Sequence, residues 1–151
     1  MRRERAFTLV ELMIVVAIIA LLAAIALPAF ARARQRTRAA KFVEAMRIAV
    51  GAFDQYAIEN GSYPADVNRG IVPAGMGNYL GEKLDFTAPT PIGGNWDWDV
   101  GNFGIKAGVS VIAPDLTDAE MRVIDAEIDD GNLATGGFRN TAPQRFTSVI
   151  E

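Results

Sequence analysis

Residues 2–30 read RRERAFTLVELMIVVAIIALLAAIALPAF and contain a long apolar run. Between Glu11 and Arg32, the twenty residues 12–31 contain no charged side chain, no amide and no hydroxyl. At about 1.5 Å per helical residue they reach roughly 30 Å, which is the thickness of the hydrocarbon core of a bilayer. Only a helix satisfies the backbone of a single segment in lipid, so the stretch predicts a membrane-spanning helix.

A removable secretory signal peptide is the alternative interpretation, because the chain begins with several arginines. The apolar core of a signal peptide is about 7 to 15 residues long and ends at a cleavage site of small residues. This apolar run is longer and continues directly into Arg32, Arg34, Arg36 and Arg38. The length and the basic flank favour a retained anchor.

The composition of the 151 residues leaves room for one domain besides the anchor. The chain has no cysteine and no histidine, which excludes disulfides, thiol chemistry and the usual zinc sites. We therefore expect a protein that is not an enzyme and needs no cofactor. From Gly61 onward there are six Lys or Arg and thirteen Asp or Glu, a net charge of −7. This charge disfavours a nucleic-acid partner for the C-terminal part.

Glu11 is a carboxylate at the head of the apolar run. A charged side chain at the centre of a bilayer costs roughly 2.5 to 3.5 kcal/mol, so a charge near that depth suggests a partner. Arg5 lies six positions back and does not share a helix face with Glu11. A cation must come from outside the chain or be made, for example by a cut that leaves an α-amine on Phe7. Without such a cation, Glu11 would extend toward the lipid headgroups.

The stretch RAFTLVELMIVVAIIALLAAIALPAF resembles the N-terminus of type IV prepilins and of type II secretion pseudopilins. The resemblance implies that prepilin peptidase cuts between Ala6 and Phe7, removes the leader 1–6 and methylates Phe7. The family usually has Gly before the cut, where this chain has Ala6, the nearest steric substitute. Glu11 would then pair with the N-terminal amine of a neighbouring subunit as the subunits form a filament.

The same resemblance implies partners and a location. The partners are further copies of the chain in a helical filament, prepilin peptidase, the inner-membrane assembly machinery and membrane lipid. The N-terminus would be cytoplasmic and the globular domain periplasmic, before assembly into a periplasmic or extracellular filament. Counting cations gives the opposite orientation, because five Lys or Arg in residues 32–41 outnumber the three of the leader. The motif takes precedence because it includes a cytoplasmic processing step.

Two machines use such subunits. The absence of cysteine favours a type II secretion pseudopilin, since many major pilins close a C-terminal loop with a disulfide. A type IV pilus subunit for adhesion, motility or DNA uptake is the alternative. A ligand-binding domain tethered to the membrane, using Trp96 and Trp98, and a membrane-anchored hydrolase that uses carboxylates are further alternatives.

The helix is predicted to continue beyond the membrane segment 7–31. Pro28 removes one backbone hydrogen bond and predicts a kink, and the resemblance implies a bend there during filament packing. Residues 32–60 read as an amphipathic continuation that ends near Asn60, because Gly61 and Pro64 follow. Its expected buried positions recur at three- and four-residue steps: Phe42, Met46, Ala49, Phe53 and Tyr56 or Ala57.

Residues 61–151 are predicted to form a globular α+β domain. Strands are expected over 95–100, 103–106 and 109–112, with a turn at 101–102 and a bulge at Gly108, and a last strand over 145–150. Thr117 and Glu120 form the pattern of a capping box that begins a helix ending near Gly131. The expected fold is pilin-like, with the long N-terminal helix packed on a small antiparallel sheet.

Two acidic clusters are candidates for chemistry. Some major pseudopilins bind calcium near their C-terminus. The candidate calcium ligands in this chain are Asp125, Glu127, Asp129 and Asp130. These residues fail the EF-hand pattern, because Asp130 stands where Gly is needed and Gly136 where Glu is needed. We expect a solvated helix end without a metal. Asp97 and Asp99 should lie on an exposed strand face opposite the buried Trp96 and Trp98, without catalytic function.

Overall fold

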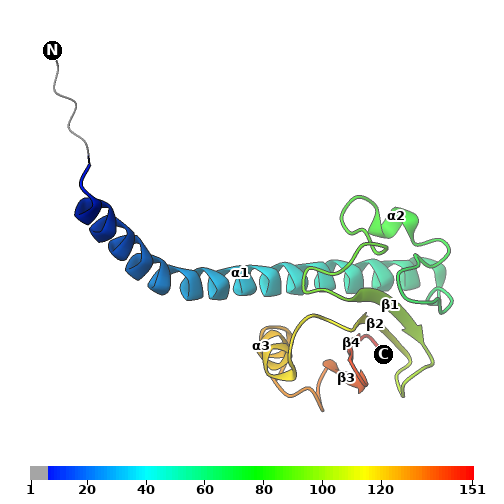
Figure 1. Cartoon of the computed structure of the whole chain (residues 1–151). Helices are drawn as coiled ribbons and strands as arrows, with labels where there is room; N and C mark the ends of the chain where they lie inside the picture. The colour runs from blue at the N-terminus through cyan, green and yellow to red at the C-terminus, as the bar shows by residue number, and fades with distance from the viewer. Residues whose placement is uncertain (1–6) are drawn as a thin grey trace. The chain divides into compact units, whose positions relative to one another are not determined.

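The computed structural model describes residues 7–151, and its longest element is helix α1, Leu9–Asn60 (Figure 1). The helix ends where the sequence predicts: the Gly61 N–H donates to the Ala57 carbonyl at 2.8 Å, and Gly61 has a φ of 74°. Glycine suits this position because it adopts a left-handed conformation at little cost. The chain divides into two compact units, Met1–Thr37 and Arg38–Glu151.

The described part of the first unit is helical and apolar. Its large apolar side chains between Leu9 and Phe30 are all exposed. Among the described residues, α1 is the one helix long and apolar enough to cross a membrane. Pro28 lies inside the helix, which is assigned without interruption on both sides of it. The kink at Pro28 stays a prediction.

The second unit contains a four-stranded antiparallel sheet in the order β1-β2-β4-β3. Figure 1 shows the four labelled strands of this sheet. The predicted α+β, pilin-like fold is confirmed. The elements that follow α1 are α2 (Gly77–Leu80), β1 (Asn95–Val100), β2 (Ala107–Ile112), α3 (Asp118–Ile128), β3 (Phe138–Ala142) and β4 (Arg145–Val149).

The core of this unit lies between the second half of α1 and one face of the sheet. The ring of Phe53 stacks on Trp98 at a centroid distance of 3.8 Å, and Phe42 stacks on Trp96 at 5.7 Å. The indole N–H of Trp98 donates to the Pro64 carbonyl at 3.1 Å. The predicted helical positions Phe42, Met46, Ala49 and Phe53 are buried, as the periodicity indicates.

Three expectations for the connection between β1 and β2 are wrong. The connection is the six-residue loop 101–106 and not a turn at 101–102 alone. Residues 103–106 belong to a loop instead of a strand, because Phe103 has a φ of 52° and the Ile105 N–H donates to the Asn102 carbonyl. Gly108 is not a bulge, since it pairs in regular register with Asp99. The loop absorbs the residues that a bulge would otherwise accommodate.

The ends of the later elements differ slightly from the predictions. Helix α3 stops at Ile128, three residues before Gly131, and β4 stops at Val149. Strand β3 and the single turn α2 were not predicted. Strand β3 reads FRNTA, and its polar residues hide the alternation that identifies a strand.

Candidate functional site

The N-terminal end of α1 carries most of the predicted site residues. Ala6, with the rest of the leader 1–6, lies outside the described residues. Phe7 is 77% exposed. The Thr8 backbone N–H and hydroxyl both donate to Glu11 Oε2, at 2.9 and 2.8 Å. In return, the Glu11 N–H donates to the Thr8 hydroxyl at 3.3 Å.

This reciprocal arrangement is a capping box, with Thr8 at the N-cap and Glu11 three residues later. The Thr8 carbonyl also accepts the first helical hydrogen bond, from the Leu12 N–H. A carboxylate in the first turn is stabilised by the partial positive charge of the helix N-terminus. Thr8 was not predicted, although the pattern Thr-x-x-Glu that marks the start of α3 also occurs here.

One side of α1 offers an apolar surface close to Glu11. A shallow hollow of about 420 Å³ is lined by Leu9, Leu12, Met13, Val16, Ala17 and Ala20. The side chains of Ala17 and Ala20 are small, so another helix can approach this surface closely. A hollow with these residues suits apolar packing and contains no group for acid–base chemistry.

Arg38 differs from the other arginines that follow the apolar run. Its Nε donates to the Pro91 carbonyl at 2.9 Å, and its guanidinium lies 3.6 Å from the Asp115 carboxylate. Arg32, Arg34 and Arg36 are exposed. Arg38 therefore attaches α1 to loops of the globular unit, while the three preceding arginines remain available to solvent or lipid headgroups.

Asp97 and Asp99 are buried, so the expectation of an exposed strand face is wrong. Their residues are only 5% and 3% exposed. Arg145 Nη1 donates to Asp97 Oδ2 at 2.8 Å and to Asp99 Oδ2 at 2.5 Å. The Ser110 hydroxyl also donates to Asp99 Oδ2. The guanidinium of Arg145 is in turn covered by the ring of Phe103, whose centroid lies 4.2 Å away.

Burial is the main cause that raises the pKa of Asp97 to about 6; Arg145 opposes the rise, and the negative charge of Asp99 contributes to it. One oxygen, Asp97 Oδ1, has no hydrogen-bond partner within residues 7–151. Asp97 and Asp99 therefore form a buried ion cluster with Arg145. The cluster lies on the face of the sheet opposite Trp96 and Trp98. Trp96 and Trp98 are buried, as predicted, and form no exposed platform for a ligand.

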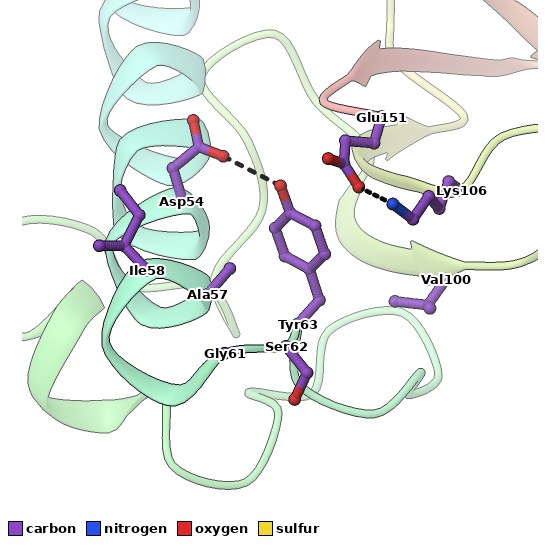
Figure 2. A pocket seen from close by; sticks show the side chains of 9 residues that line it. All are labelled: Asp54, Ala57, Ile58, Gly61, Ser62, Tyr63, Val100, Lys106 and Glu151. Atoms are coloured by element: carbon purple, nitrogen blue, oxygen red, sulfur yellow. Dashed lines mark hydrogen bonds and ion pairs between the residues drawn. The ribbon is translucent and has the colours of Figure 1, made fainter.

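A hollow of about 580 Å³ lies at the C-terminal end of α1 (Figure 2). The Tyr63 hydroxyl donates to Asp54 Oδ1 at 3.2 Å, and Lys106 pairs with Glu151. Burial raises the pKa of Tyr63 to about 12, and the charge of Asp54 and its hydrogen bond contribute to the rise. Tyr63 thus stays protonated at neutral pH and serves as a hydrogen-bond donor rather than as a base.

The acidic residues at the end of α3 also differ from the expectation. Asp125 is fully buried, so this helix end is not simply solvated. One carboxylate oxygen each of Asp125, Asp129 and Asp130 lies within 4.8 Å of the others, and Glu127 is not part of the group. Burial raises the pKa of Asp125, and the charges of Asp130 and Asp129 add to the rise. Of the three acids only Asp125 is buried, whereas Asp129 and Asp130 are exposed.

Comparison with known proteins identifies similar chains. Residues 1–27 match the family model described as the prokaryotic N-terminal methylation motif. The chain is 36% identical over 94 residues to the type IV wide pilus major component PilA4 of Thermus thermophilus, covering 52% of this chain and 72% of that protein. No solved structure matches the chain.

Two further relatives are covered less completely. The fimbrial protein EcpC of Eikenella corrodens is 38% identical over 88 residues, which cover 58% of each chain. The type II secretion system core protein G of Klebsiella pneumoniae is 34% identical over 64 residues, covering 42% of this chain and 46% of that protein. The chain thus spans less than two thirds of either of these two proteins.

Proposed function

Because the chain belongs to the type IV pilin family, we propose that it is a structural subunit of a type IV pilus-like filament. In this proposal residues 7–31 hold the subunit in the inner membrane, with the globular unit in the periplasm, until it polymerises. The main support for this proposal is the apolar first half of α1, whose large apolar side chains are exposed along its length. Outside lipid such a helix is stable only when sister helices cover it.

Processing at Ala6 and Phe7 and pairing through Glu11 are part of the proposal. The capping box supports a need for an external cation, because both Thr8 groups that contact Glu11 are neutral donors. They fix the position of the carboxylate without removing its charge. A charged α-amine on the Phe7 of a neighbouring subunit would neutralise that charge, and would do so only in one axial register.

We propose a type II secretion pseudopilin as the first candidate for the particular filament. The absence of cysteine supports this assignment, because it excludes the C-terminal disulfide of many major pilins. A type IV pilus subunit is the second candidate. The alignment supports it by covering 72% of a pilus component but only 46% of a secretion component. Deletion of the gene separates them: loss of protein secretion with normal surface pili supports the first, and the reverse result supports the second.

The polymerisation proposal is tested by mass and by fibre yield. Intact protein from cells with prepilin peptidase should begin at a methylated Phe7, and protein from cells without the peptidase should keep residues 1–6. Glu11→Ala should leave the monomer in the membrane but abolish or disorder fibres seen by electron microscopy. The matched control is Glu44→Ala, which removes an exposed carboxylate from the same helix outside the membrane segment. Normal fibres from Glu11→Ala, or an unprocessed Met1 terminus in cells with the peptidase, would contradict the proposal.

A further inference from the structure

Asp97 lines a hollow of about 340 Å³ in the globular unit, next to the loop 101–106 and the segment 66–69. We infer that this hollow is a binding site for an ammonium group, supplied by a small amine or by a lysine side chain of a second copy of the chain. The volume is at the small end of the range for ligand sites, which suits a compact group. The inference goes beyond the proposed filament function, because the site lies within one chain.

The ion cluster behind the hollow lacks one positive charge. Asp97 and Asp99 are 5% and 3% exposed, and a single nitrogen, Arg145 Nη1, contacts Oδ2 of both. When both carboxylates are ionised, one guanidinium leaves one negative charge without compensation. A buried charge without a partner is strongly unfavourable, so the cluster needs either a proton or a further cation.

The second oxygen of Asp97 indicates where that cation binds. Asp97 Oδ1 is buried and has no hydrogen-bond partner within the described part of the chain. Arg145 contacts the other oxygen, and the ring of Phe103 covers its guanidinium. An ammonium group carries three N–H donors and one positive charge. It would therefore satisfy the unpaired oxygen and neutralise the remaining charge at once, through a charge-assisted hydrogen bond.

The rim of the hollow suits the same kind of group. Asp66, Asn68 and Asn102 are exposed there and offer a carboxylate and two amide oxygens as further acceptors. Arg69 is also exposed at the rim, and the charged residues that line the hollow together carry a net charge of −1. Among the described residues, these acids are not the ones whose oxygens come close enough together to share a metal ion. A cation that brings its own hydrogen-bond donors therefore fits the hollow better than a bare ion.

The test uses n-butylammonium chloride and the full-length chain in a non-ionic detergent. Saturation-transfer NMR detects binding directly, and urea unfolding followed by tryptophan fluorescence measures its effect on stability. At ten times the dissociation constant, the ratio of folded to unfolded protein should rise about tenfold. Tetramethylammonium has the same charge but no N–H donor, so at the same concentration it should leave this ratio almost unchanged. Because the chain is unassembled here, a negative result leaves the proposed filament function untouched.

Binding should also depend on pH in a defined direction. Burial is the main cause that raises the pKa of Asp97 to about 6, while the amine stays protonated up to about pH 9. Ammonium binding requires the ionised carboxylate, so the dissociation constant should be about tenfold higher at pH 5 than at pH 8.

Variants at the hollow make the result specific. Asp97→Asn should abolish the response to butylammonium, while the matched control Asp118→Asn, which neutralises an exposed acid at the start of α3, should retain it. Arg69→Gln removes the like charge at the rim and should tighten binding several-fold. This exposed variant keeps the inference testable if Asp97→Asn does not fold. The inference is overturned if the wild-type chain does not bind butylammonium, if tetramethylammonium has the same effect, if Asp97→Asn responds as the wild type does, or if Arg69→Gln fails to bind.

Purified filaments distinguish the two sources of the ammonium group, and this comparison alone rests on the proposed function. Lys41 and Lys83 are exposed, whereas Lys106 pairs with Glu151. If a lysine of a second copy fills the hollow, wild-type filaments should exclude butylammonium, and Lys41→Gln or Lys83→Gln filaments should bind it. If the hollow takes a free amine, wild-type filaments should bind butylammonium as the single chain does. Either result supports the site, whereas filaments that exclude the probe in all three forms would contradict it.

Discussion

Replacing Asp97 by Asn should stabilise the globular unit above pH 6, although the substitution removes one carboxylate of an ion cluster. The reason is that burial raises the pKa of Asp97 from 3.8 to about 6 in spite of Arg145. The folded protein therefore holds the Asp97 proton more tightly than the unfolded chain does. Neutral Asn resembles the protonated carboxyl group in shape and carries no charge that must be buried.

The sign and the size follow from proton linkage. Between about pH 4 and pH 6 the folded state binds more protons than the unfolded state, so the free energy of unfolding falls as the pH rises. Above about pH 6 this decrease in the free energy of unfolding is complete. A pKa that rises from 3.8 to about 6 corresponds to about 3 kcal/mol, at about 1.4 kcal/mol for each tenfold change. The Asp97→Asn variant avoids this loss.

Urea unfolding of the full-length chain in detergent, followed by tryptophan fluorescence at pH 5 and pH 8, measures the difference. The variant should be more stable than the wild type by up to about 3 kcal/mol at pH 8, and the difference should shrink toward pH 5. Asp99→Asn is the matched control. Asp99 Oδ2 accepts hydrogen bonds from both Ser110 and Arg145, so this variant should lose about 1 to 3 kcal/mol. An Asp97→Asn variant that is less stable than the wild type at pH 8 would refute the reasoning.

Two further predictions concern single contacts in the same unit. Arg145→Met leaves Asp97 and Asp99 buried without a counterion and should lower the free energy of unfolding by about 3 to 5 kcal/mol; an unchanged urea midpoint at pH 8 would contradict this. Thr117→Ala removes the hydroxyl that accepts the Glu120 N–H and should cost about 1 kcal/mol, measured by urea unfolding, whereas Thr117→Ser should retain most of the stability. An equal loss in both Thr117 variants would exclude capping as the cause.

The sequence predicts the elements whose pattern is local. The three- and four-residue spacing of Phe42, Met46 and Phe53 is enough to identify the buried face of α1, and alternation identifies β1. The burial of Asp97 and Asp99 could not be predicted, because their partner Arg145 lies 48 and 46 residues further along the chain. A strand that is buried on both faces, with the polar face covered by one distant arginine, has the same sequence pattern as a half-exposed strand.

In the candidate sites too, contacts between residues close in the sequence could be predicted, and contacts between distant residues could not. Thr8 and Glu11 are three residues apart, so their capping box was within reach of the sequence. Asp125 lies in the last turns of α3, whereas Asp129 caps the helix with a non-helical backbone. The burial of Asp125 was not predictable, since it depends on the return of the chain into β3.

The capping box also clarifies what the proposed assembly requires of Glu11. In the membrane the Thr8 donors hold the carboxylate in place, yet the charge itself still opposes burial by up to roughly 2.5 to 3.5 kcal/mol if it reaches the bilayer centre. In a filament that supplies an α-amine, the same charge becomes one half of a desolvated ion pair. Glu11 therefore favours the assembled state only after an amine exists on Phe7. Polymerisation of a chain that still carries its leader lacks this contribution, which would make cleavage a condition for assembly rather than a mere trimming step.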